Sequence, residues 1–234
     1  MPTKAQTNPA LKAANRRMCL AIENDARETA RWTGRGVISP SVMAQMAGVP
    51  RHRFMGFADS DPAATGAYAN RAQPIAQRQT ISQPFIVAVM TDLLDLEPDD
   101  RVLEVGTGCG YQTAILAGLS AEVYSVERIP VLSAEAARNL EALDISNAFL
   151  RIGDGFDGWP EHAPYDAIIV TAAPRTAPPA LLDQLAPGGR LVVPVGEADG
   201  SQMLQRFVRR ADGETTVAGL LPVAFVPMIG DVAT

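Results

Sequence analysis

Short apolar runs alternate with helix-like segments from about residue 83 onward, and this alternation constrains the fold more than any other feature. The β-rich runs are residues 102–105, 122–126, 148–152, 166–171 and 190–194. They contain few polar residues, as is typical of strands that are buried on both faces. Between them, apolar residues recur at helical spacing over residues 112–119, 131–144 and 178–186. This order predicts parallel βαβ units with right-handed crossovers.

The C-terminal part of the chain departs from that order. Asp212-Gly213 separates two strand-like runs, residues 202–210 and 215–228, and such a dipeptide between strands predicts an antiparallel hairpin. The predicted fold class is therefore α/β. We expect a doubly wound, Rossmann-like sheet of seven strands, mostly parallel, with an antiparallel C-terminal hairpin and N-terminal helices.

The N-terminal portion reads as helical. Apolar positions spaced mostly by four or seven predict one amphipathic helix within residues 8–35. A second helix is expected from Pro40 to Gly48, with Ser39 as its cap. Residues 53–70 are rich in Gly, Ala, Asp and Pro, which predicts a loop.

Composition and charge exclude several function classes. The 234 residues carry a formal charge of −6, so no broad basic face for nucleic acid is expected. Two cysteines, Cys19 and Cys109, cannot build a disulfide framework and suit a reducing compartment. The apolar runs are shorter than the ~20 residues that span a bilayer, and the polar N-terminus is unlike a signal peptide. We therefore expect a soluble cytoplasmic protein with no membrane partner.

A glycine-rich loop lies between the first strand of the alternation and the next helix. Gly106, Gly108 and Gly110 place it at the carboxyl end of that strand, where open α/β sheets bind ligands. A dinucleotide fingerprint would have its third glycine at position 111, which is Tyr111, and a phosphate-binding Walker loop would need a lysine. A tight turn without a ligand is the alternative reading of this loop.

Three acidic residues accompany the loop. Glu127 ends the second strand, 21 residues after Gly106, where a carboxylate can bind a ribose diol. Asp154 follows the third strand, and Glu104 lies inside the first, where a carboxylate needs a partner. Acids without a phosphate-binding cation suggest a positively charged nucleoside such as a sulfonium. A solvated strand end at Glu127 and a turn residue at Asp154 are the alternatives.

Longer stretches of the sequence resemble the protein-L-isoaspartate O-methyltransferases, which use S-adenosylmethionine. The likeness runs in order from about residue 39 to 229. The stretches that carry it are residues 48–54, 79–94, 101–117, 123–130, 153–174, 185–196 and 222–228. Within them, QTISQP (79–84) and VTAAP (170–174) are specific to this family, whereas the glycine loop is common to class I methyltransferases.

The resemblance implies a division of the chain at residue 78. Residues 1–78 would form a helical portion with a substrate-side loop, and residues 79–234 the class I methyltransferase domain, together one compact unit. The implied cofactor-binding residues are Gln79, Thr80, Glu104, Gly106, Thr107, Gly108, Gly110, Glu127, Asp154 and Gly155. Within this set, the glycine loop would hold the methionine end, Glu104 its amino group and Glu127 the ribose. Asp154 and Gly155 would face the adenine.

The resemblance also implies the acceptor side of the site. The substrate-binding residues would be Pro74, Ile75, Ile81, Ser82, Phe225 and Val226, with Ser82 as the catalytic hydroxyl. The acceptor would be the free α-carboxylate of an isoaspartyl residue in a damaged protein, and its methyl ester would close to a succinimide. A carboxylate with a pKa of about 4 is already ionised, so neither a general base nor a metal is expected. A monomer is favoured.

Two features leave alternatives open. Ser82 precedes Gln83-Pro84, so its hydroxyl could instead cap the following helix. The family pattern Leu-Pro-Ile-Gly-x-Gly reads Gln-Pro-Ile-Ala-Gln-Arg here, over residues 73–78. Arg78 either points to solvent or indicates another substrate, such as a more acidic peptide. The alternative functions are a methyltransferase for one dedicated peptide and a cofactor-binding adaptor without turnover.

Overall fold

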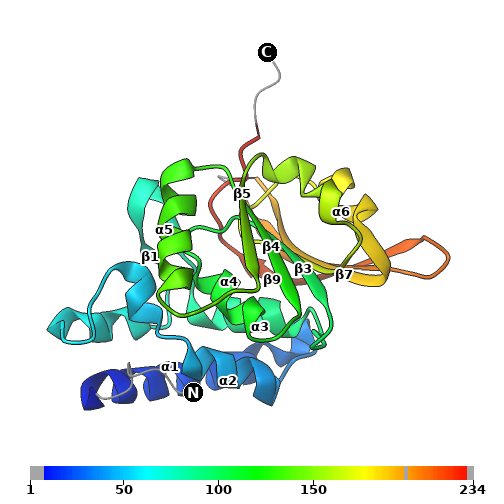
Figure 1. Ribbon diagram of the computed structural model, residues 1–234. Coiled ribbons are helices and arrows are strands. Elements are labelled where there is room, and N and C mark those ends of the chain that lie inside the picture. Colours follow the sequence, from blue (N-terminus) through cyan, green and yellow to red (C-terminus); the bar gives the residue numbers. More distant parts are fainter. Residues whose placement is uncertain (1–7, 198–199, 231–234) are drawn as a thin grey trace.

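The computed structural model describes residues 8–197 and 200–230 and has a seven-stranded sheet at its centre (Figure 1). The strand order is β5-β4-β3-β6-β7-β8-β9, parallel from β5 to β7 and antiparallel for β8 and β9. The strands are β3 (Arg101–Val105), β4 (Glu122–Glu127), β5 (Ala148–Ile152), β6 (Tyr165–Val170), β7 (Leu185–Gly196), β8 (Gln202–Arg209) and β9 (Thr215–Val223). The predicted fold class is confirmed, including the C-terminal hairpin.

The central strands are buried on both faces, as their apolar runs predict. Side chains alternate along a strand, so Val102 packs into one hydrophobic core and Leu103 into the other. In β6, Ile169 likewise packs into the first core and Ile168 into the second. The first core also contains buried residues of α1 such as Met18, so the N-terminal helix shares a core with the sheet.

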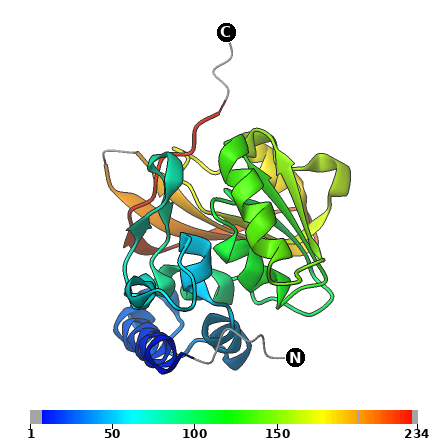
Figure 2. The same cartoon turned by 60° about the vertical axis from the view of Figure 1, so that its left-hand side comes forward.

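Helices cover both faces of the sheet. They are α1 (Pro9–Thr33), α2 (Pro40–Gly48), α3 (Pro84–Asp92), α4 (Tyr111–Ala117), α5 (Pro130–Glu141) and α6 (Pro179–Asp183). The first five line the face that contains α1, and α6 places Leu181 in the opposite core. Figure 2 shows α1 and α2, in blue, at the base of the molecule. None of the helices in the described ranges is long and apolar enough to cross a membrane.

The strand expected at residues 148–152 is present but is not buried on both faces, because β5 lies at the edge of the sheet and exposes Phe149 and Ile152. Three other local expectations are wrong. Residues 53–70 are not simply a loop, since two 3-10 helices, η2 (Arg51–Met55) and η3 (Pro62–Tyr68), bury Phe54 and Ala64. The side chain of Ser39 does not cap α2, although its backbone N–H donates to Asp92. The helix expected over 178–186 ends at Asp183. The chain then enters β7, where Gly188 at φ +81° lies within a strand whose pairing with β6 shifts register.

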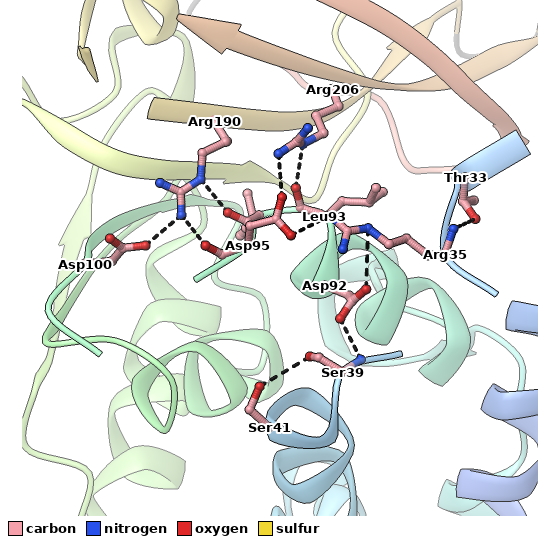
Figure 3. Close-up of polar contacts among 11 residues, drawn as sticks. Thr33, Arg35, Ser39, Ser41, Asp92, Leu93, Asp95, Asp100, Arg190 and Arg206 are labelled. Carbon is pink, nitrogen blue, oxygen red and sulfur yellow. Dashed lines mark hydrogen bonds and ion pairs between the residues drawn. The ribbon is translucent and has the colours of Figure 1, made fainter. Parts of the chain in front are cut away.

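An ion-pair network fastens the N-terminal helices to the sheet at the end of β3 remote from the glycine loop (Figure 3). Asp95, just after α3, accepts from Arg206 of β8 at 2.7 Å and also pairs with Arg35, which follows α1. Arg190 of β7 pairs with Asp100 at 2.8 Å. One carboxylate thus joins the α1–α2 connection to the C-terminal hairpin, which fixes the position of α1 beside the sheet.

Candidate active site

A cavity opens at the carboxyl ends of β3, β4 and β6. Its floor is the glycine loop, and the segment 79–82 and the C-terminal segment 226–229 form two of its sides. Polar groups in its wall include Thr80, Ser82, Thr107, Gln112, Glu127, Arg128 and Thr171. Apolar groups include Val105, Val126, Ile129, Leu132 and Met228. A mostly apolar pocket with a few convergent polar groups at this edge of an α/β sheet is typical of a ligand site.

At two positions of the glycine loop, Gly106 and Gly110, the backbone conformation and the close packing both require glycine. Gly106 has φ +97°, and a Cβ there would lie 2.3 Å from Oγ1 of Thr171. That hydroxyl is itself fixed, because it donates to the Gly106 carbonyl at 2.7 Å. Gly110 has φ +88° and is the N-cap residue of α4, and a Cβ there would lie 3.2 Å from that of Ala136. The loop therefore packs closely against its neighbours and presents bare backbone to the cavity.

Glu127 brings a carboxylate into the cavity wall at the end of β4. Its exposed fraction is 7%, and its two oxygens accept backbone N–H bonds from Gly108 at 2.8 Å and Ile129 at 2.9 Å. Each carboxylate oxygen has a second lone pair, so both retain the capacity to accept a hydroxyl. The loop and the acidic group thus form one rigid unit.

Glu104 is placed differently from the other acids, since it lies fully buried beneath the loop and does not line the cavity. One oxygen accepts from Thr113 at 2.5 Å and Ser125 at 2.7 Å. The other has no hydrogen-bond partner among residues 8–197 and 200–230. Burial raises the pKa of Glu104 to about 8, although the two hydroxyl donors act to lower it. A neutral carboxylic acid in the folded protein follows from this setting.

Glu104→Gln should flatten the pH dependence of stability. The folded state holds a proton on Glu104 that the unfolded chain releases at its ordinary pKa near 4.5. This group therefore makes stability fall as pH rises from about 4.5 to about 8, by up to about 1.4 kcal/mol per pH unit. Urea unfolding at pH 5.5 and 7.5 measures the slope. Glu141→Gln, an exposed change on α5, is the control, and an unchanged slope in Glu104→Gln would count against a neutral Glu104.

Ser82 lies at the edge of the cavity, and it is not the cap of α3. The N-cap residue is Gln83, whose side chain makes no capping bond, and the N–H of Phe85 is instead satisfied by Oδ1 of Asn70 at 3.0 Å. The Ser82 hydroxyl has no hydrogen-bond partner within the part of the chain that the structure describes. It is thus available to a ligand.

A buried guanidinium holds the backbone of Ser82 in place. Arg51 of η2 has an exposed fraction of 0%, donates to the Ser82 carbonyl at 2.8 Å and donates to the Ala67 carbonyl at 2.9 Å. It also lies over the ring of Tyr111, with 4.9 Å between its central carbon and the ring centroid. Burial lowers the pKa of Arg51, and no carboxylate of the described residues forms an ion pair with it. Arg51 therefore couples η2 and η3 to the segment that contains Ser82.

Arg51→Lys should destabilise the protein by about 1–3 kcal/mol, because an ammonium cannot reproduce the planar fork that reaches two carbonyls. Chemical unfolding measures the loss. The same change at Arg71, an exposed residue for which the structure shows no side-chain hydrogen bond, should cost less than about 0.5 kcal/mol. Equal stability of the two variants would mean that the Arg51 bonds contribute little.

A second cleft adjoins the cavity. It has a volume of about 710 Å³, within the roughly 300–1,000 Å³ of typical ligand sites. Its lining includes residues of α1 and the segment 221–226. Four residues line both the cavity and the cleft: Thr80, Ser82, Thr171 and Val226. A group in the cleft and a group in the cavity would therefore meet beside Ser82.

The C-terminal wall is held from two sides. Gln202 of β8 accepts from the Phe225 N–H at 2.6 Å and donates to the Phe225 carbonyl at 3.1 Å. The Ala173 N–H donates to the Val226 carbonyl at 2.8 Å, which ties the segment to the VTAAP stretch. The last bond joins the C-terminal segment to residues 170–174, and the cavity is lined by residues of both specific stretches, 79–84 and 170–174.

Comparison with known proteins decides the family. A family model described as protein-L-isoaspartate(D-aspartate) O-methyltransferase matches residues 30–233. The chain belongs to the protein-L-isoaspartate(D-aspartate) O-methyltransferase family. A protein-L-isoaspartate O-methyltransferase 2 of Syntrophobacter fumaroxidans is 51% identical over 220 residues, which are 93% of this chain and 87% of that protein. One of Polaromonas sp. is 50% identical over 204 residues, 87% and 95% of the two chains.

Solved structures agree with this assignment to the isoaspartate methyltransferases. A protein-L-isoaspartate O-methyltransferase superposes with a TM-score of 0.78 at 26% identity, over 93% of this chain and 66% of that one. A beta-aspartate methyltransferase structure from Plasmodium falciparum, in complex with S-adenosyl-L-homocysteine, gives a TM-score of 0.71 at 24% identity, over 89% and 97% of the two chains. The second likeness supports the fold alone. The protein is an S-adenosylmethionine-dependent methyltransferase.

The cavity fits the cofactor of this family. A nucleoside needs an acceptor for its ribose hydroxyls and an apolar slot for its base, and the cavity offers Glu127 beside Ile129 and Met228. A side chain at Gly155 would fill the wall, since its Cβ would lie 2.4 Å from Val105 and 3.0 Å from Met228. Cys109 also lines the cavity, and burial raises the pKa of its thiol to about 11, so it is protonated at neutral pH.

Most residues that the resemblance assigns to the isoaspartate methyltransferase site lie at the cavity or cleft. Those lining the cavity are Gln79, Thr80, Ile81, Ser82, Gly106, Thr107, Gly108, Glu127, Gly155 and Val226, and Phe225 lines the cleft. Five of the assigned residues line neither: Pro74, Ile75, Glu104, Gly110 and Asp154. Asp154 caps η5 (Gly155–Asp157) by accepting from the Phe156 N–H at 2.9 Å, and Ile75 is 3.9 Å from a Cβ built on Gly108.

Other lining residues have no assignment from the sequence. Thr171 and Met228 stand in stretches that the resemblance quotes, so their position in the pattern could have indicated them. Asp25 and Glu28 come from α1, and only tertiary packing brings them to the cleft. Arg51 of η2 lines neither cavity nor cleft and reaches the site through the Ser82 carbonyl, although it stands in the quoted stretch 48–54. Arg78 has φ +58° where the family pattern has glycine, is exposed, and lines neither cavity nor cleft.

Proposed function

We propose that the protein methylates the free α-carboxylate of isoaspartyl residues, the first step in returning damaged residues to aspartate. The observation that carries the proposal is the junction of cavity and cleft at Ser82. A cofactor in the cavity and a peptide in the cleft would bring donor and acceptor together there. The family membership supports the same chemistry.

In this proposal, different residues of the cavity bind different parts of the cofactor. Glu127 binds the ribose hydroxyls through the free lone pairs of its two oxygens. Backbone of the loop from Gly106 to Gly108 faces the methionine end, while Gly155 leaves room for the adenine. Glu104 does not touch the cofactor in this proposal and acts through Ser125. Ser125 donates a hydrogen bond to Glu104 and forms another with Thr107 at 2.6 Å, so Glu104 supports the glycine loop from below.

Ser82 orients the acceptor. Its hydroxyl has no partner among the described residues, so it is available to donate to one carboxylate oxygen and direct the other oxygen at the methyl group. S-Adenosylmethionine supplies a methyl group bonded to a sulfonium. The carboxylate oxygen forms the new C–O bond as the C–S bond breaks, and the bonding pair goes to sulfur. No proton moves, so alignment by Ser82 and the cleft is the chief contribution, worth up to ~7–11 kcal/mol.

The test uses labelled S-adenosylmethionine and a matched pair of peptides that differ only in isoaspartyl or aspartyl linkage. We expect methyl transfer to the isoaspartyl peptide alone. Transfer to neither peptide by a protein that binds the cofactor would support the dedicated-substrate alternative. Cofactor binding without methyl transfer to any peptide or protein tested would support the non-catalytic adaptor.

We also propose that the substrates are damaged proteins and peptides in the cytoplasm, with a monomer acting alone and no nucleic-acid partner. The net charge of −6 and the two free cysteines support this setting. Cys19 and Cys109 lie in separate elements, α1 and the glycine loop. Size-exclusion chromatography with light scattering would measure the oligomeric state.

A further inference from the structure

The acceptor cleft has an uneven distribution of charge. Two carboxylates line it, Asp25 and Glu28, and they are its only charged lining residues in the described ranges. They stand one turn apart on α1, so they face the same side of the helix. The rest of the wall is apolar or neutral, including Thr29, Phe85 and the segment 221–226.

Asp25 lies close to the reacting position. One of its carboxylate oxygens accepts from Gln83, the residue after Ser82, at 3.3 Å, and from Asn70 at 2.9 Å. Both partners are neutral amides, so its charge is not compensated there. Glu28 is exposed and has no ion-pair partner in residues 8–197 and 200–230. The two charges therefore act on whatever enters the cleft.

The acceptor itself brings a negative charge, since its reacting group is a carboxylate. Two further carboxylates in the cleft wall repel an acceptor with no other charge or with additional acidic residues. A basic side chain near the isoaspartyl residue reverses that balance, because it places a cation beside Asp25 and Glu28. Arg78, the residue that suggested acidic peptides, lines neither cavity nor cleft.

We propose that Asp25 and Glu28 are specificity-determining residues that select acceptors with a lysine or arginine close to the isoaspartyl residue. The proposal rests on the proposed function and names the substrate class of the same cleft. Both residues precede the part of the chain that the family model matches, residues 30–233. The selection thus comes from a helix that lies mainly outside the matched region.

The test compares kcat/KM for isoaspartyl peptides that differ at one position, which holds Lys, Ala or Glu and is scanned on both sides of the isoaspartyl residue. We expect a roughly tenfold preference for Lys over Glu at the best position in low salt, since the attraction of the lysine and the repulsion of the glutamate add, and each involves both carboxylates. In 1 M salt the Debye length is about 3 Å, and the preference should shrink to about twofold.

Variants show whether the cleft carboxylates cause the preference. Glu28→Gln should reduce it by a factor of about two to three, and Glu28→Lys should reduce it by a similar factor again, so that little or no preference remains. Glu23→Gln removes the same charge from an exposed position of α1 that does not line the cleft, and should leave the preference intact. Equal kcat/KM for all peptides, or a preference that Glu28→Gln leaves unchanged, would overturn this inference alone. Absence of transfer to every isoaspartyl peptide would overturn the proposed function as well.

Discussion

Ser82→Ala should lower the rate of methyl transfer by a factor of roughly 10²–10³, the usual cost of one well-placed hydrogen-bond donor to a reacting oxygen. The reason is geometric. The hydroxyl stands where cavity and cleft meet and has no partner in the described part of the chain, so its loss leaves the acceptor carboxylate free to rotate. Single-turnover transfer to an isoaspartyl peptide measures the chemical step, and calorimetry with S-adenosylhomocysteine measures cofactor affinity, which should change little.

Ser39→Ala provides the matched control. Ser39 also precedes a helix that begins with proline. Among the described residues, the one hydrogen-bond partner of its side chain is the Ser41 hydroxyl, at 3.3 Å (Figure 3). It belongs to neither cavity nor cleft, so turnover should stay normal. Normal turnover in Ser82→Ala too would remove Ser82 from the mechanism and leave alignment to the cleft walls and the Arg51-supported backbone.

The sheet could be predicted from the sequence because its signals are local. Strands β3, β4, β5 and β6 are apolar runs of five or six residues between helices, and Asp212-Gly213 marks the hairpin. The errors occur where tertiary contacts decide. Residues 53–70 have loop-like composition, but Phe54 and Ala64 find places in a core that the sequence does not reveal. Pro187-Gly188-Gly189 reads as a stop, yet β7 continues through it because β6 supplies a pairing edge.

The same distinction applies to the residues of the site: local structure explains some of them, and tertiary packing brings in the others. The glycine loop and Glu127 are joined by a strand–helix–strand unit, so their spacing alone brings them together. Asp25 and Arg51 reach the site from α1 and η2 across gaps of 58 and 31 residues to Gln83 and Ser82, and no short pattern encodes such contacts. Glu104 shows the limit of spacing: it stands beside the loop in sequence, but the alternation of β3 turns it beneath the loop, away from the cavity.

Glu127→Gln should weaken cofactor binding by roughly 100- to 1,000-fold. The carboxylate accepts from two backbone N–H groups, and in the proposed function it also accepts from the ribose hydroxyls. A glutamine offers one acceptor oxygen and turns an NH₂ toward the other N–H, so a charge-assisted bond becomes a contact between two donors. Each bond to a charged group contributes about 1.5–3 kcal/mol, and tenfold in affinity corresponds to about 1.4 kcal/mol. Calorimetry with S-adenosylhomocysteine measures the loss.

Glu127→Gln and Ser82→Ala should impair different steps, cofactor binding in the first variant and methyl transfer in the second. At saturating S-adenosylmethionine, Glu127→Gln should recover much of its turnover, because the acceptor and Ser82 are untouched, whereas Ser82→Ala should not recover. Glu122→Gln is the control on the same strand: Glu122 lies at the opposite end of β4 and pairs with Arg101 at the surface at 3.1 Å. The cofactor affinity of Glu122→Gln should match that of the unaltered protein. An equally unaffected affinity in Glu127→Gln would mean that the ribose is bound elsewhere in the cavity, and that Glu127 serves only to brace the loop through Gly108 and Ile129.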